Sequence, residues 1–148
     1  MAERVLKVTS EDPRFVPDAM RLGDAMDFLA DSTGTNDVCT EWWCSPKFID
    51  CGEYLESIVC PFCGKEVPFD SWGEAMNVAE GKGFSDLGMT MPCCGRKGSL
   101  DRLDYRRPCA IAMFKIELRN VPGDVTEDML KEAGRILGTG LKTVEARY

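Results

Sequence analysis

Eight cysteines and no histidine define the chemistry open to this 148-residue chain. Two five-residue segments repeat one pattern: residues 60–64 read Cys-Pro-Phe-Cys-Gly, and residues 91–95 read Met-Pro-Cys-Cys-Gly. A turn of this kind directs its sulfurs toward one point, and the glycine lets the backbone curl beneath them. Two such turns that face each other form a tetrahedral thiolate cage, for which zinc is the commonest ion. The pattern therefore predicts a metal site.

We expect four cysteines to be the ligands of this ion: Cys60, Cys63, Cys93 and Cys94. The second pair is less regular than the first, because adjacent cysteines must contort to reach the same ion. If one of them does not bind, Cys51 or Cys44 is the replacement. Met91 occupies the position where the pattern expects a ligand, but a thioether suits softer ions such as Cu(I) better than Zn²⁺.

The predicted zinc site is structural rather than catalytic. A catalytic zinc keeps an open position and commonly has histidine among its ligands, and this chain has no histidine. The same absence removes the commonest general base and the Ser–His and Cys–His nucleophile pairs. The two cysteine pairs are 29 residues apart, whereas about 15–20 residues are usual. The segment between the pairs must therefore contain additional structure.

Two other chemistries compete with this interpretation. The first motif resembles a redox dithiol, which becomes reactive at a helix N-terminus, but Pro68 opposes a long helix directly after Cys63. The turn with Asp50, Cys51 and Glu53 offers a general acid–base pair for a small enzyme. Acidic residues in turns are more often solvated or cap the backbone, so the enzyme is the alternative hypothesis.

Charge and hydropathy limit the partners of the chain. The formal net charge is −7, and four thiolates with one Zn²⁺ would add two further negative charges. Such a chain repels phosphate backbones, which disfavours nucleic acid. No apolar run approaches the roughly 18 residues of a membrane span, and no signal peptide is visible. We therefore expect a cytoplasmic protein whose thiols are reduced.

Hydrophobic spacing predicts the elements that must position these residues. The expected strands cover residues 5–8, 38–49, 54–59, 87–91, 109–119 and 141–148. A first helix is expected to begin at Pro17, and two more to begin at capping boxes formed by Ser71 with Glu74 and by Asp124 with Glu127. Residues 100–108 are expected to be a charged connection. On a strand the adjacent Trp42 and Trp43 point to opposite faces, so one of them needs separate cover.

Without the metal-binding segment, the element order is strand–helix–strand repeated twice. This order is typical of the ferredoxin-like split β-α-β sheet, an α+β fold. We expect four antiparallel strands with both helices on one face and with the strands at 5–8 and 109–119 in the centre. Residues 1–148 would form a single α+β domain. Residues 52–108 would be a zinc-binding insert between the strands at 38–49 and 109–119.

The cysteine motifs resemble those of zinc-ribbon proteins. Residues 48–53, the two cysteine motifs and the terminal residues 146–148 together resemble a group of small uncharacterised bacterial proteins with a zinc-ribbon-like insert. The resemblance spans most of the chain and implies no activity. The displaced Cys93 is the departure from a standard ribbon.

The leading functional hypothesis is a non-enzymatic, zinc-stabilised binding protein. One form of it is an acidic inhibitor or immunity-type partner of a basic protein, because complementary charge speeds association. The exposed member of the Trp42 and Trp43 pair would anchor that partner, since tryptophan is enriched among the residues that dominate binding energy.

Overall fold

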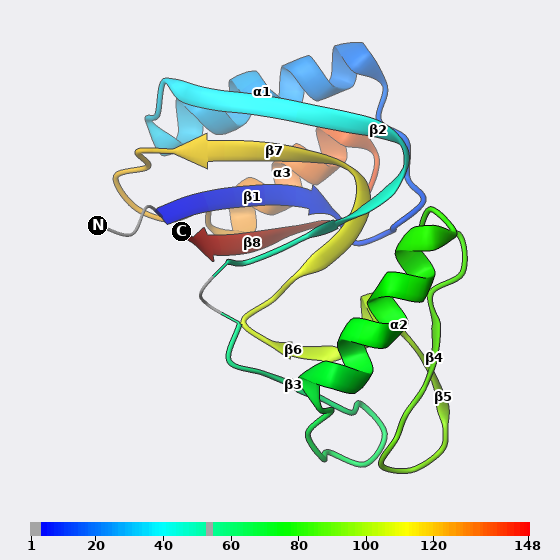
Figure 1. Cartoon of the computed structure of the whole chain (residues 1–148). Helices are drawn as coiled ribbons and strands as arrows, with labels where there is room; N and C mark the ends of the chain where they lie inside the picture. Colours follow the sequence, from blue (N-terminus) through cyan, green and yellow to red (C-terminus); the bar gives the residue numbers. More distant parts are fainter. Residues whose placement is uncertain (1–3, 53–54) are drawn as a thin grey trace.

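The body of the protein is a four-stranded antiparallel sheet. The computed structural model describes residues 4–52 and 55–148. The sheet has the order β2-β7-β1-β8, and its strands are β1 (Arg4–Ser10), β2 (Asp37–Ile49), β7 (Ala110–Arg119) and β8 (Leu141–Arg147). The first and last strands pair with each other, which brings the two ends of the described chain together (Figure 1). The central positions predicted for the strands at 5–8 and 109–119 are confirmed.

Two helices, α1 (Ala19–Thr33) and α3 (Glu127–Leu137), cover one face of this sheet (Figure 1). The alternation predicted for β7 is confirmed, because Phe114, Ile116 and Leu118 are fully buried beneath the helices. The polar residues between them lie on the opposite face, as the two-residue period of a strand requires. Among the described residues, no helix has the length and apolar character that a membrane span needs.

The predicted start of α1 at Pro17 is wrong by two residues. Asp18 is the N-cap, and its carboxylate accepts a hydrogen bond of 3.1 Å from the backbone N–H of Arg21. A side-chain acceptor at this position satisfies an amide that has no partner within the helix. The helix therefore begins at Ala19.

The predicted cap of α3 is also wrong. Thr126, not Asp124, caps the helix, and its hydroxyl accepts a 3.2 Å hydrogen bond from the N–H of Met129. The Asp124 carboxylate is instead paired with the guanidinium of Arg4 at the start of β1. A contact distant in sequence therefore competes with the local capping pattern for this side chain.

Residues 57–106 form a second body, which we call the lobe (Figure 1). It contains two short antiparallel pairs, a helix and a 3₁₀ turn: β3 (Ser57–Val59) with β6 (Asp104–Arg106), β4 (Gly88–Thr90) with β5 (Lys97–Ser99), α2 (Phe69–Gly81) and η1 (Leu100–Arg102). The strand predicted over residues 54–59 is present from Ser57 onward, whereas residue 54 lies outside the described residues. The buried apolar cluster of the lobe includes Ile58, Met91 and Leu100, and it extends to Ile111 of β7.

Two predictions within the lobe are wrong. Helix α2 begins at Phe69 with Pro68 as its N-cap, so Ser71 lies inside the first turn and does not cap it. Proline is tolerated at a helix start because its missing N–H would have no partner there. The segment 100–108 contains η1 and β6, because residues 104–106 pair with β3. The Tyr105 hydroxyl also donates a 2.6 Å hydrogen bond to the carbonyl of Leu100.

The two adjacent tryptophans of β2 have different environments, as predicted. Trp42 is 61 % exposed, whereas Trp43 packs against the buried cluster that contains Ile49 and Val144. β2 is an edge strand, and its register with β7 shifts between Trp42 and Lys47. The edge position agrees with Pro46, which lacks an amide for a second neighbouring strand.

Glycine-to-alanine substitutions in two helices are expected to have opposite effects. A Cβ at Gly134 would lie 2.7 Å from the carbonyl oxygen of Thr139, so Gly134→Ala should destabilise the protein by roughly 1–2 kcal/mol. At Gly23 a Cβ meets nothing within 4 Å, and Gly23→Ala should stabilise α1 by about 0.5–1 kcal/mol. Urea denaturation of both variants checks this. Equal effects of one sign would contradict the packing described at Gly134.

Candidate metal centre

The two cysteine turns have the same backbone hydrogen bonds. In the first turn the N–H of Cys60 donates to the carbonyl of Lys65 at 2.8 Å, and the N–H of Gly64 donates to the carbonyl of Cys60 at 3.0 Å. The second turn repeats both bonds at 2.8 Å, with Met91 in the place of Cys60. Gly64 and Gly95 have φ of 76° and 74°, a conformation that favours glycine. The sequence repeat is therefore also a structural repeat.

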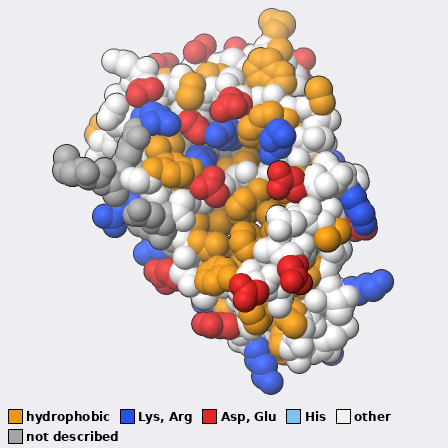
Figure 2. Space-filling model, viewed as in Figure 1, with side chains coloured by type: hydrophobic (Ala, Val, Ile, Leu, Met, Phe, Trp, Pro, Cys, Tyr) orange, Lys and Arg blue, Asp and Glu red, His pale blue; other side chains and the backbone are white. Residues whose placement is uncertain are grey.

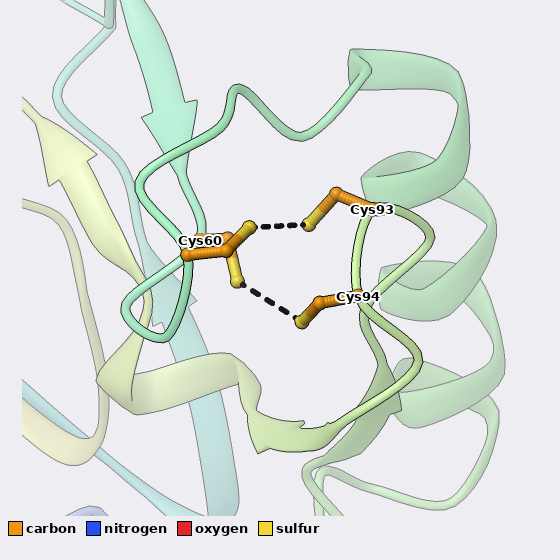
Figure 3. A group of neighbouring side chains, drawn as sticks. Cys60, Cys93 and Cys94 are labelled. Atoms are coloured by element: carbon orange, nitrogen blue, oxygen red, sulfur yellow. Dashed lines mark hydrogen bonds between the residues drawn. The ribbon is translucent and has the colours of Figure 1, made fainter.

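The turns bring together the four predicted ligand residues: Cys60, Cys63, Cys93 and Cys94. Their sulfurs all lie within 4.8 Å of one another. The Sγ atoms of Cys60 and Cys94 are 3.8 Å apart, and those of Cys63 and Cys93 are 3.2 Å apart. Ligands about 2.3 Å from a tetrahedral zinc would be separated by about 3.8 Å. Figure 3 shows the side chains of the two turns pointing toward one another.

The adjacent cysteines of the second turn both belong to this group. Met91 is fully buried and is part of the lobe's apolar cluster. Cys51, one of the two replacement ligands considered from the sequence, lies beside Cys109 instead. The other, Cys44, is exposed on β2 and is not part of the group. The group therefore consists of four thiols that could hold one metal ion.

The four thiols have unequal exposure and acidity. Cys60 is buried, whereas Cys63 and Cys94 are exposed. Burial opposes the ionisation of Cys60, but hydrogen bonds from the N–H groups of Cys63 and Phe62 outweigh it and lower the pKa to about 7. Hydrogen bonding with Cys63, together with burial, raises the pKa of Cys93 to about 12. Metal binding must displace the remaining protons, so the affinity should rise with pH.

The donor set indicates the kind of ion and its role. Four sulfur ligands select soft or borderline metals over Mg²⁺ or Ca²⁺, which prefer oxygen. Four protein ligands also complete a tetrahedral shell, which is typical of structural sites and leaves no position for a reacting water. The geometry therefore fits an ion that connects the two turns of the lobe.

The acidic turn of the alternative hypothesis has a different environment from the one expected. Asp50 interacts with the Lys7 ammonium at 3.3 Å and with the Tyr148 hydroxyl at 3.0 Å, and it accepts a 3.0 Å hydrogen bond from the N–H of Gly52. Burial opposes ionisation of this carboxyl, but Lys7 and Tyr148 outweigh it and lower its pKa. Cys51 is only 1 % exposed. Glu53 lies outside the described residues.

Sequence reasoning did not identify a second pair of neighbouring cysteines. The sulfurs of Cys51 and Cys109 are 3.4 Å apart, and both residues are buried. Neither belongs to a short motif, because the two are far apart in the chain. Their positions could have indicated that they are neighbours, because they directly flank the segment 52–108 that was expected to be an insert in the sheet domain.

Comparison with protein-family models, with curated proteins and with solved structures gave no match to this chain. The description of the metal centre therefore rests on the geometry of the four cysteines and on their chemistry.

Proposed function

We propose that the four-cysteine group binds one structural zinc ion and that the chain is a non-enzymatic binding protein stabilised by this ion. The observation that carries the proposal is the approach of all four sulfurs within 4.8 Å. A tetrathiolate shell stabilises a fold and offers no open position for catalysis. Metal analysis of the purified, reduced protein tests the first part, with one zinc per chain as the expected result.

We further propose that the sheet body is a ferredoxin-like domain and that residues 52–108 are a zinc-ribbon-like insert within a single domain. The strand order β2-β7-β1-β8, with a helix following β1 and another following β7, supports this topology. The order of the elements, with the lobe after β2 and before β7, supports the proposed insert. A reducing, cytoplasmic setting is part of the proposal, because the cage requires reduced thiols.

The proposed partner is a basic protein, of which an inhibited enzyme or a toxin neutralised by an immunity-type protein would be examples. The net charge of −7 supports electrostatic attraction to such a partner. Trp42 is 61 % exposed on edge strand β2. Figure 2 shows hydrophobic side chains gathered between the sheet body and the lobe, with acidic side chains beside them. An exposed tryptophan on an acidic chain suits a cationic protein surface.

The enzyme alternative has less support from the same structure. Asp50 is engaged with a lysine and a tyrosine, which lowers its pKa and leaves it ionised at neutral pH. A general acid needs a pKa raised toward the working pH. Cys51 is buried at 1 % exposure and faces another thiol.

Substitution of Trp42 tests the binding proposal. We expect Trp42→Ala to weaken binding to the basic partner at least about tenfold, because exposed tryptophans commonly anchor interfaces. The stability of the protein should change by less than about 0.5 kcal/mol, since the side chain is mostly outside the core. Affinity capture from a native lysate, followed by titration of the captured partner, measures both the stoichiometry and the loss.

Met20→Ala is the matched control, because Met20 is 81 % exposed and belongs to α1 rather than to β2. The proposal predicts one stoichiometric basic partner that the wild type and Met20→Ala retain, that Trp42→Ala loses, and that dissociates as salt is raised. A partner that all three proteins bind equally well, or no stoichiometric partner, would contradict this role for Trp42.

A further inference from the structure

Cys51 and Cys109 lie at the point where the lobe joins the sheet body. Cys51 follows the end of β2, and Cys109 directly precedes β7. Their side chains are buried at 1 % and 2 % exposure, and their sulfurs are 3.4 Å apart. Neither belongs to the four-cysteine metal group, so this pair of facing thiols has no role in the proposed zinc site.

We propose that Cys51 and Cys109 are a covalent modification site, at which a peroxide converts the two thiols into a reversible disulfide that closes the base of the lobe. The site is separate from the proposed zinc site, because neither thiol belongs to the four-cysteine group. The Cys51 and Cys109 pair would react with oxidants. The third buried cysteine, Cys60, belongs to the four-cysteine group that would bind the metal.

The local backbone holds the two thiols in position for this bond. The carbonyl of Cys51 accepts a 3.1 Å hydrogen bond from the N–H of Arg147, and the carbonyl of Cys109 accepts one of 2.7 Å from the Lys142 ammonium. Both partners belong to β8, so one strand of the sheet anchors both cysteines. A disulfide has an S–S distance of about 2.0 Å, so the sulfurs must approach by about 1.4 Å. Small side-chain rotations supply such a movement.

The reaction consumes one peroxide per disulfide. The pKa of Cys109 is raised by burial and by the neighbouring Cys51, so Cys109 keeps its proton and we assign the first attack to Cys51. The Cys51 sulfur attacks one oxygen of hydrogen peroxide, the O–O bond breaks, and the hydroxide that leaves takes up the thiol proton as water. The Cys109 sulfur then attacks the sulfur of the sulfenic acid, and the S–O bond breaks. The leaving hydroxide takes up the proton of the Cys109 thiol, so a second water is released.

The bond would link the two connections between the lobe and the sheet body. In the unfolded chain it would close the loop from residue 51 to residue 109, which restricts the unfolded ensemble. We therefore expect the oxidised protein to have a thermal midpoint higher by roughly 5–10 °C.

The test uses the metal-loaded full chain in which the exposed thiols outside the four-cysteine group are removed by Cys39→Ser and Cys44→Ser. The protein is treated with hydrogen peroxide, quenched with catalase, alkylated, and digested with trypsin and a glutamate-specific protease. Cleavage after glutamate separates Cys51 from Cys60, because glutamates at positions 53 and 56 lie between them. The expected product is a peptide pair linked through Cys51 and Cys109. It should be two hydrogens lighter than the sum of its parts and should disappear on reduction.

If the protein keeps its metal during the treatment, the four cysteines of the metal site have not been oxidised and the disulfide does not come from them. Two results would overturn the proposal: alkylation of both Cys51 and Cys109 after peroxide treatment, or a bond from either of them to a different cysteine. Cys109→Ala should abolish the linked peptide and leave Cys51 as a sulfenic or sulfinic acid. If that variant does not fold, the peptide map of the protein with both thiols still decides the question.

Discussion

Cys93→Ser is expected to lose the metal and to unfold the lobe, while the sheet body stays folded. The lobe is about 50 residues long, and domains of this size often need a metal or a disulfide to fold. Structural zinc sites in zinc-finger peptides have apparent binding free energies of about 10–16 kcal/mol, and these peptides unfold without the ion. Serine is a poor ligand for zinc, so the variant should bind it more weakly by several orders of magnitude.

Adding Met91→Cys to Cys93→Ser is expected to restore metal binding and the folded lobe. Met91 makes the same two turn hydrogen bonds as Cys60, so a cysteine at position 91 would present its sulfur as Cys60 does. The double variant would convert the displaced motif into a regular Cys-x-x-Cys turn. Some loss of stability should remain, because Met91 is fully buried and the smaller side chain leaves a cavity.

Metal content per chain and hydrogen exchange over residues 57–106 measure these outcomes. Cys44→Ser is the matched control, because Cys44 is an exposed cysteine of β2 outside the metal group. It should bind one ion, as the wild type does. If Cys93→Ser retained a full equivalent of metal with a protected lobe, Cys93 would not be a ligand.

Local sequence patterns predicted the parts of the molecule that depend on local periodicity. The alternation from Phe114 to Leu118 identifies the central strand because one face of a strand must be buried. The repeated cysteine turns identify the metal group for a similar reason, since a five-residue segment fixes the direction of its own sulfurs. The central positions of β1 and β7 followed from the order of the elements once the lobe was set aside.

The errors occur where residues distant in the chain compete with a local pattern. The spacing of Asp124 predicts a helix cap, but its carboxylate forms an ion pair with Arg4 instead. The charges of residues 100–108 favour an irregular connection, yet the segment contains η1 and β6. Its Tyr105 packs against Trp72, which is distant in the sequence. The Cys51 and Cys109 pair also has no local signal, because the two cysteines are far apart in the chain and come together only in the folded protein.

The buried lysine of β1, Lys7, is another feature without a local signal. Lys7 lies in the apolar strand β1 and is only 2 % exposed. Its ammonium donates a 2.9 Å hydrogen bond to the backbone carbonyl of Asp50, lies 3.3 Å from the Asp50 carboxylate, and donates to the Tyr148 hydroxyl. The Tyr148 hydroxyl also donates to the Asp50 carboxylate. These contacts connect the end of β2 to the two outer ends of the chain.

Asp50→Ala is expected to destabilise the protein by roughly 2–3 kcal/mol, because it leaves a buried ammonium without a countercharge. The value lies below the 3–5 kcal/mol typical of fully buried pairs, since the Asp50 side chain is 48 % exposed and partly screened. Urea denaturation at pH 7 measures this loss. Lys7→Met should change stability by less than about 1 kcal/mol, because an apolar chain of similar length fills the same space.

Combining the two substitutions separates the charge from the packing. In the Lys7→Met background, Asp50→Ala should cost less than about 1 kcal/mol, since no buried charge remains to be neutralised. The pKa of Asp50 is lowered in the folded state, so its contribution is present above the unfolded value of about 3.9 and is lost as pH falls through the lower folded value. The difference between wild type and Asp50→Ala should therefore be constant near neutrality and shrink below about pH 4. Equal losses in both backgrounds would show that Lys7 and Asp50 do not interact energetically.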